Sequence, residues 1–448
     1  MDYKLYIIIP IIFLFTACGE VETGDEEKSP PTIHYNDKKI SCQQSKSSHK
    51  LFNYTDREPF QIEHKDKIKL LVKNTLPSSK NSSFNNEELY KLFTTEYYWA
   101  SQIDKDFDYT TYTTPQNLID AVKYKKDRWS FAVTAEVYND LISQKSVGIG
   151  VICQDFETGC LITYVRLDSP ADKIDLRRGD IVEKINGHIA TQELFYTESQ
   201  KEKELTLEIT RVNSNENCSG SVTPREYTYK VAKGELLKTP NNEKVAYLRM
   251  DSFLGDKSIT QQLNTSFDNF KKNNIEKLII DLRYNGGGSV DLASELINKL
   301  STTNQNQEQF TLAWNSDYQS NNETYKFKTA HNALNLKQII FLTTQNTASA
   351  SELIISAMKP YLSESNLVVI GDKTHGKPVG MGGRIDKEYY YFLINFVVKN
   401  SLGYYDYFQG IPVTQGCNVI DDPFHEMGDP NEIMLKTALN YIDSGSCQ

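Results

Sequence analysis

From residue 245 onward, short continuous apolar runs alternate with longer amphipathic segments, and this alternation constrains the fold more than any other sequence feature. The longer segments repeat apolar residues at helical spacing, as at Ile259, Leu263 and Phe267. The short runs lack an alternating polar face, which is typical of strands buried on both sides. Residues 245–448 are therefore predicted to form an α/β core in which helices flank a mixed sheet. The strand-like runs span residues 245–248, 278–282, 339–342 and 367–371.

Residues 146–234 differ in texture, because shorter apolar runs alternate there with turn residues and predict a small, mainly β module. A glycine-rich loop opens this module, and residues 169–187 then read SPADKIDLRRGDIVEKING. This order of loop, short helix, glycine turn, strand and Asn-Gly turn closely resembles a PDZ domain. The resemblance implies that a peptide adds as a strand while the loop amides bind its C-terminal carboxylate. A module used only as a spacer is the alternative. The predicted carboxylate-binding residues are Gly148, Ile149, Gly150 and Val151.

Two segments with possible chemistry follow strand-like runs of the core, where loops often carry function. Residues 278–288 read LIIDLRYNGGG, a buried strand that runs into glycines. Such glycines let backbone amides approach a developing oxyanion. Residues 343–352 read TTQNTASASE and place Ser349 at a helix start, whose amides favour negative charge. Ser349 and Glu352 also have the spacing of a capping box, which is the purely structural alternative.

A third segment, residues 368–380, reads VVIGDKTHGKPVG and places Lys377 just after an apolar strand. A lysine in such a turn is more often solvated than functional. It becomes a general base only if burial lowers its pKa from about 10.4, since only the neutral amine can accept a proton.

Taken in order, the three segments resemble the C-terminal processing (tail-specific) peptidases, a serine peptidase family with a PDZ module ahead of its core. The resemblance implies that residues 245–448 form a serine peptidase core with Ser349 as nucleophile and Lys377 as its base. It also implies an oxyanion hole made by the amide of Ala350 with that of Gly287 or Gly288. The implied activity is cleavage of proteins or peptides, without a cofactor.

One departure from the family pattern concerns the base. The family commonly has Gln four positions after the lysine, and this sequence has Met381 there. The residue that orients Lys377 is therefore unassigned, with Gln345 and Gln409 as candidates. His375 could itself act as the base.

Two rival interpretations remain open. A catalytically inactive relative could bind peptides through its PDZ module and cleave nothing. A penicillin-binding type acylase is suggested by Ser356 and Lys359, which have the SxxK spacing, although no SDN or KTG partner appears. The two residues would also be ordinary neighbours within one helix.

The beginning of the chain predicts export. Lys4 precedes an apolar run over residues 5–15 that is too short for the ~20 residues of a membrane-spanning helix. Cys18 follows small residues, as in a bacterial lipoprotein signal. We therefore expect residues 1–18 to be a lipoprotein signal peptide and Cys18 to carry the lipid anchor, which places the protein at a membrane of the bacterial cell envelope. An ordinary secretory signal with a chance cysteine is the alternative.

Residues 19–50 are acidic and then rich in Ser, Lys and Pro, which predicts a flexible tether. Residues 51–145 show mostly helical spacing and are predicted to form a helical N-terminal domain. A chain of 448 residues is long enough for about three domains, and its net charge of −10 makes nucleic acid an unlikely partner.

The cysteines indicate an oxidising compartment rather than a metal site. Apart from Cys18 the number is even, which is compatible with disulfides in an exported chain. Cys153 and Cys160 flank a predicted hairpin and could bridge it, but the connectivity stays open. We expect no metal, because no cysteine or histidine pair has metal-ligand spacing. The remaining cysteines are Cys42, Cys218, Cys417 and Cys447.

Overall fold

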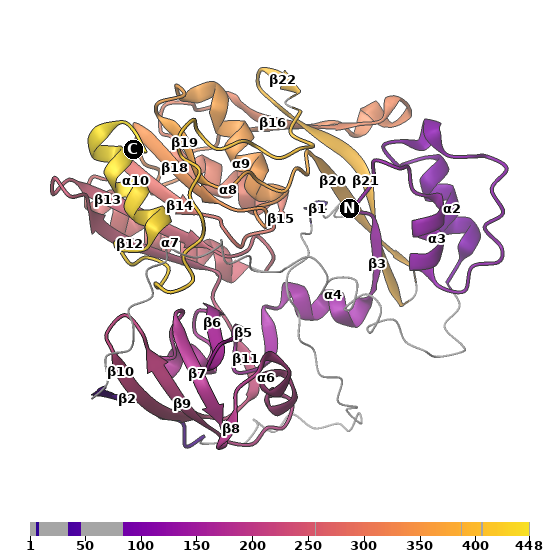
Figure 1. Cartoon of the computed structure of the whole chain (residues 1–448). Helices are drawn as coiled ribbons and strands as arrows, with labels where there is room; N and C mark the ends of the chain where they lie inside the picture. Colours follow the sequence, from indigo (N-terminus) through magenta and orange to yellow (C-terminus); the bar gives the residue numbers. More distant parts are fainter. Residues whose placement is uncertain are drawn as a thin grey trace, which may run out of the picture.

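The predicted signal peptide and most of the predicted tether lie outside the part of the chain that the structure describes, and so does Cys18. Of residues 51–145, only those from 84 onward are described. None of the described helices has the length and apolar character that a membrane span requires. The computed structural model describes residues 35–45, 84–255, 257–386, 388–404 and 406–447, and the backbone of 6–8 (Figure 1).

A five-stranded sheet forms the centre of the C-terminal core (Figure 1). In spatial order its strands are β12 (Ala232–Lys238), β13 (Lys244–Met250), β14 (Lys277–Asp281), β18 (Gln338–Thr343) and β19 (Leu367–Gly371). β12 runs antiparallel to β13, whereas all other neighbours are parallel. The predicted mixed sheet is therefore confirmed.

Helices cover both faces of this sheet. Leu278 and Ile280 of β14 pack into one hydrophobic cluster, and Ile279 between them packs into another on the opposite face. This division follows from strand geometry, because successive side chains point to opposite sides. The first cluster lies under α7 (Lys257–Lys272), α8 (Val290–Leu300) and α9 (Ala350–Met358), and the second lies under α10 (Ile433–Ser444).

A second sheet connects the core to the N-terminal helical part. Its order is β15 (Gly288–Ser289), β1 (Tyr6–Ile8), β20 (Val379–Asp386), β21 (Tyr389–Asn400), β16 (Glu308–Trp314) and β17 (Glu323–Lys326). β3 (Phe131–Thr134) and β22 (Gly403–Tyr404) also pair with β21. Through β3, the helical part is joined to β21, which is the partner of β20, the strand that follows Lys377.

The described N-terminal part contains helices and strand β3, and it shares one hydrophobic cluster with the β20–β21 hairpin. Leu89, Phe93 and Leu118 pack there together with Met381 and Phe392. Its helices are α2 (Asn86–Thr94), α3 (Pro115–Val122) and α4 (Ala135–Ile142), with a short 3-10 turn, η2 (Ala100–Gln102).

The small β module forms a separate lobe in Figure 1, with its own hydrophobic core. Its sheet has the order β2 (Lys38–Gln44), β10 (Glu216–Val222), β9 (Leu205–Arg211), β7 (Asp180–Ile185), β6 (Gly159–Val165) and β5 (Val151–Phe156). β8 (His188–Ile189) pairs with β7, and β4 (Lys145–Gly148) pairs with β11 (Arg225–Thr228). Two helices complete it, α5 (Pro170–Lys173) and α6 (Gln192–Ser199).

The predicted tether over residues 19–50 is wrong in one part, because residues 38–44 form strand β2. This strand pairs with β10, and Cys42 stands opposite Cys218, to which it is disulfide-bonded. The acidic and lysine-rich composition could not reveal this, since the partner strand lies far along the sequence. The other disulfides are Cys153–Cys160, which bridges the predicted hairpin, and Cys417–Cys447.

Candidate active site

Ser349 lies at the turn from β18 into α9, where it is the N-cap residue. Its φ of 62° and ψ of −115° lie outside the regions that a serine ordinarily adopts. Strain of this kind persists only where the surroundings impose it, often at functional sites. The side chain is 1% exposed, and its Oγ has no hydrogen-bond partner in the described part of the chain. A buried hydroxyl left unpaired in this way is a candidate for a reactive group.

Glu352 connects Ser349 to the segment that carries Lys377. Its Oε2 accepts hydrogen bonds from the backbone N–H groups of Ser349 and Lys377, each at 2.8 Å. Its Oε1 accepts from the Gly376 N–H at 2.7 Å and from the Thr374 hydroxyl at 2.5 Å. Burial raises the pKa of Glu352, while these hydrogen bonds lower it. The sequence predicted only a helix cap here, and no local signal indicated the second role.

Lys377 is 3% exposed, and its Nζ lies 4.0 Å from Sδ of Met381 on β20. Burial lowers the pKa of Lys377 to about 7, although the nearby charges of Asp127 and Glu352 act to raise it. A large fraction of the amine is therefore neutral near pH 7. This is the condition under which a lysine can serve as a general base.

The other candidates for orienting or replacing Lys377 have different partners. Gln345 is exposed and donates its side-chain amide to Asp372 at 2.9 Å, and Gln409 is also exposed. Nε2 of His375 accepts a hydrogen bond from the Trp129 indole at 3.2 Å. The pKa of His375 is lowered, first by burial and then by nearby positive charges.

The glycine segment after β14 lies directly against Ser349. A Cβ on Gly287 would lie 2.7 Å from the Ala350 nitrogen and 3.0 Å from Ser349 Cβ, so only glycine fits. Asn285 fixes this segment, because its Oδ1 accepts from the Gly287 N–H at 2.8 Å and its Nδ2 donates to a backbone carbonyl. The Gly287 amide is thus already bound, which favours Gly288 as the second predicted oxyanion donor.

A slot between β15 and β20, occupied by residues 6–8 of the chain itself, lies beside this segment. The backbone of Tyr6–Ile8 forms β1 between β15 and β20 and pairs antiparallel with both. Ile8 stands opposite Gly288, and Ile7 stands opposite Met381, which contacts the Lys377 amine. β15 and β20 thus offer backbone pairing on both sides of a strand in this position.

The predicted carboxylate loop precedes β5, which is the outermost strand of its sheet. Gly148 has a φ of 118°, and a Cβ on it would lie 3.7 Å from Ser199 at the end of α6. Ile149 and Gly150 direct their carbonyls inward, to the backbone amides of Ala171 and Arg166. Val151 begins β5 itself. The loop and the edge strand β5 thus lie beside α6.

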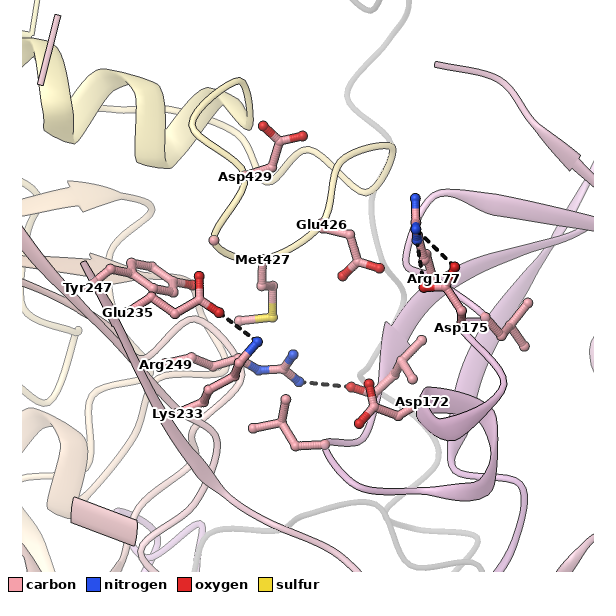
Figure 2. A pocket seen from close by; sticks show the side chains of 14 residues that line it. Asp172, Asp175, Arg177, Lys233, Glu235, Tyr247, Arg249, Glu426, Met427 and Asp429 are labelled. Atoms are coloured by element: carbon pink, nitrogen blue, oxygen red, sulfur yellow. Dashed lines mark hydrogen bonds and ion pairs between the residues drawn. The ribbon is translucent and has the colours of Figure 1, made fainter. Parts of the chain in front are cut away.

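A cavity of about 330 Å³ separates the small β module from the core, as Figure 2 shows. Ion pairs lie on both of its walls, Arg177–Asp175 on the module and Lys233–Glu235 on β12. Glu426 lines it as well, and burial raises the pKa of this carboxyl to about 7.

Beside this cavity, Arg178 links the small β module to the core. Its guanidinium binds Asp421 at 2.7 Å and the Tyr284 hydroxyl at 2.9 Å. Arg283 of the core shares the Asp421 carboxylate, at 2.8 Å. The module is thus tied to the strand end that leads into the glycine segment. The sequence did not reveal this contact, because its partners are widely separated along the chain.

Two other candidate groups, the Ser356–Lys359 pair and a cluster around Cys42, do not form a comparable site. Ser356 is buried in the third turn of α9 and Lys359 follows the helix end, so the SxxK spacing reflects helix periodicity. Among the described residues, Cys42, Glu216 and Cys218 bring potential metal ligands within 4.8 Å. The two sulfurs are joined in a disulfide and offer no thiolate to a metal.

Two protein-family models match parts of this chain. The model of peptidase family S41 matches residues 244–384, and the model of the peptidase S41 N-terminal domain matches residues 75–131. The chain therefore contains domains of peptidase family S41, and the three predicted segments lie within the first match.

Individual relatives are more distant. The "Probable CtpA-like serine protease" of Staphylococcus epidermidis is 28% identical over 323 residues, which cover 69% of this chain and 62% of the relative. A protein of the same name from Staphylococcus aureus is 26% identical over 320 residues, covering 68% and 58%. The chain thus matches about three fifths of the length of these relatives. A crystal structure from Bacteroides fragilis assigned to the S41 proteases shares the fold, with a TM-score of 0.70 at 23% identity over 81% of this chain and 98% of that chain.

Proposed function

We propose that this protein is an exported, lipid-anchored serine endopeptidase that cleaves proteins or peptides, with Ser349 as nucleophile and Lys377 as general base. One observation carries the proposal: a strained, buried serine and a buried lysine with a pKa of about 7 are tied to the same carboxylate, that of Glu352. A helix cap alone would require neither the strain at the serine nor the burial of the amine.

The chemistry follows from these positions. The neutral amine of Lys377 takes the proton of the Ser349 hydroxyl, and Oγ attacks the carbonyl carbon of the scissile peptide bond. The amides of Ala350 and Gly288 stabilise the resulting oxyanion. The Lys377 ammonium then gives its proton to the departing amine, which leaves an acyl-enzyme. Water, deprotonated by the same amine, releases the second product.

The substrate is an extended polypeptide. The position of β1 between β15 and β20 supports this, because it offers backbone pairing on both sides next to Gly288. In a mature protein that begins at Cys18, residues 6–8 would be absent and the slot would be open. The small β module acts as a PDZ domain that binds C-terminal tails along β5, with Gly148, Ile149, Gly150 and Val151 at the carboxylate.

Export and anchoring rest on the signal-like N-terminus and on the disulfides, which are typical of oxidising compartments. Acylation of Cys18 would place the protein at a membrane of the cell envelope. Cys18→Ser should move the protein from the membrane fraction to the soluble fraction. If the variant stays fully membrane-bound, anchoring at this residue is wrong.

The decisive experiment measures cleavage of an unstructured protein by the wild type, Ser349→Ala and Lys377→Ala. Ser349→Ala should abolish turnover, and Lys377→Ala should lower it by about 10²–10⁴-fold. Circular dichroism should establish that both variants stay folded. No cleavage by the wild type, or equal cleavage by Ser349→Ala, would contradict the peptidase proposal. The protein would then be a catalytically inactive, peptide-binding lipoprotein.

A further inference from the structure

The N-terminal helical part reaches the candidate active site through the turn at residues 127–130. Arg128 donates to the Gly376 carbonyl at 3.3 Å and to the Phe408 carbonyl at 3.2 Å. The Trp129 indole donates to His375 at 3.2 Å. This turn therefore contacts both residues that immediately precede Lys377, although it lies far from them along the sequence.

The same turn also reaches the other side of Lys377. The Ser130 hydroxyl accepts a hydrogen bond from the Ile394 N–H at 3.1 Å. Ile394 stands opposite Met381 in the β20–β21 pair, and Sδ of Met381 lies 4.0 Å from the Lys377 amine. The turn thus contacts both the segment that precedes Lys377 and the β20–β21 pair that follows it.

Asp127 is the charged residue of this turn that is most completely enclosed. Its side chain is 3% exposed, and Oδ1 accepts from the backbone N–H groups of Trp129 and Ser130 at 2.9 Å each. Oδ2 accepts from the Tyr97 hydroxyl at 2.8 Å and from the Ser130 hydroxyl at 2.5 Å. Burial and the Asp127 charge raise the pKa of Tyr97, so this tyrosine remains a donor. These four donors hold the carboxylate in one position.

We propose that Asp127 is a positioning residue of the peptidase site, whose fixed negative charge stabilises the ammonium that Lys377 becomes on taking the proton of Ser349. The inference rests on the proposed Ser349–Lys377 chemistry and adds to it a charge from a different part of the chain. It assigns the N-terminal helical part a role in catalysis itself.

The charged groups around Lys377 make this assignment specific. The charges of Asp127 in the 127–130 turn and of Glu352 on α9 both raise the pKa of Lys377 against the effect of burial. Glu352 already accepts hydrogen bonds from the backbone of the site, and Met381 offers only a thioether. His375 adds no negative charge. Burial lowers its pKa, and the positive charges of Arg128 and Lys377 lower it further.

The test replaces the charge and preserves the shape, with Asp127→Asn. In protein carrying [ε-13C]lysine, NMR follows the titration of Lys377, whose signal is assigned by its absence from Lys377→Met. We expect the titration midpoint to fall by about one pH unit, as is typical for loss of a close opposite charge. In the pH profile of kcat/KM, the midpoint of the acid limb should shift to lower pH by the same amount. The plateau value of kcat/KM should fall about tenfold, since one pKa unit corresponds to a factor of ten.

Two further variants keep the result interpretable. Trp129→Phe removes the hydrogen bond to His375 without changing any charge, so the Lys377 midpoint should stay where it is. Asp127→Ser keeps a short acceptor for the turn and should lower the midpoint if Asp127→Asn does not fold. An unchanged midpoint in the Asp127 variants, or an equal shift in Trp129→Phe, overturns the proposal. The NMR midpoint tests the effect of Asp127 on Lys377 even if the wild type cleaves nothing. Absence of cleavage by the wild type would instead refute the proposed peptidase activity.

Discussion

Ser349 and Lys377 donate their backbone N–H groups to the same oxygen atom, Oε2 of Glu352, at 2.8 Å each. The helix that begins after Ser349 and the loop that carries Lys377 are therefore held in register by one buried carboxylate. The other carboxylate oxygen binds Gly376 and Thr374, so the whole loop depends on this side chain.

Removing that carboxylate should damage both stability and activity. In Glu352→Ala, three buried N–H groups lose their acceptor, and each unsatisfied donor costs about 1–3 kcal/mol. We expect the free energy of unfolding to fall by several kcal/mol in urea titrations, and peptidase activity to be lost where the variant remains folded. Glu364 is exposed, and Glu364→Ala should change stability by no more than about 0.5 kcal/mol. Equal stability of the two variants would contradict the role of Glu352.

The pH dependence of cleavage should report Lys377. The reaction needs the neutral amine, so kcat/KM should rise with pH to a midpoint of about 7 and level off above it. A histidine base would titrate in a similar range, so His375→Asn is the necessary control. The acid limb should remain in that variant. Its disappearance would identify His375 as the base instead.

Burial of the Lys377 amine should cost stability in a pH-dependent way. Its pKa is about 7 in the folded protein and about 10.5 in the unfolded chain. Below pH 7 both states are protonated and the folded state bears the full cost. Between pH 7 and 10.5 only the unfolded chain binds the proton, so stability rises with pH by about 1.4 kcal/mol per unit from this group.

Lys377→Met removes this cost. The variant should be more stable than the wild type, most strongly below pH 7, and the difference should shrink as the pH approaches 10.5. Urea unfolding of both proteins at several pH values measures it. A difference that is independent of pH would mean that the amine is not held in its neutral form.

Ser351 provides a contrast to Ser349 within the same motif. Its hydroxyl is buried and donates to the Asn285 carbonyl at 2.9 Å, which also accepts from the Ala348 N–H. Ser351→Ala should therefore cost about 1 kcal/mol of stability and leave most of the activity. Matched cleavage assays with Ser349→Ala test this. Complete loss of activity in folded Ser351→Ala would contradict the assignment of Ser349 as the nucleophile.

Recognition of C-terminal tails can be tested separately from cleavage, in the Ser349→Ala background. Peptides with a free C-terminus should bind more tightly than their amidated versions, as measured by fluorescence anisotropy. A Cβ on Gly150 would lie 2.3 Å from Ser169 Cβ, so Gly150→Ala should distort the loop and remove the difference. Equal binding of both peptide forms to the unaltered loop would remove the case for tail recognition.

Local sequence determined the class of the core and the identity of its motif segments. Strand and helix periodicity depends on neighbours within a few positions, so residues 245–448 were predicted as a mixed sheet between helices, and the sheet is found. Ser349 and Lys377 could be selected because they stand in short motifs at strand ends. Pairing between distant strands could not be predicted from local sequence. Residues 38–44 have the composition of a tether but form β2, because β10 supplies the partner strand and Cys218 the disulfide partner.

Tertiary structure alone decided the environment of those two residues. A pKa depends on burial and on charges brought close by folding. No local sequence pattern could therefore predict that the pKa of Lys377 is about 7, or that the charges of Asp127 and Glu352 affect it. Asp127 belongs to the N-terminal helical part and Glu352 to a helix of the core. Their convergence on one amine results from long-range packing of the 127–130 turn, α9 and the Lys377 loop, which periodicity and spacing do not encode.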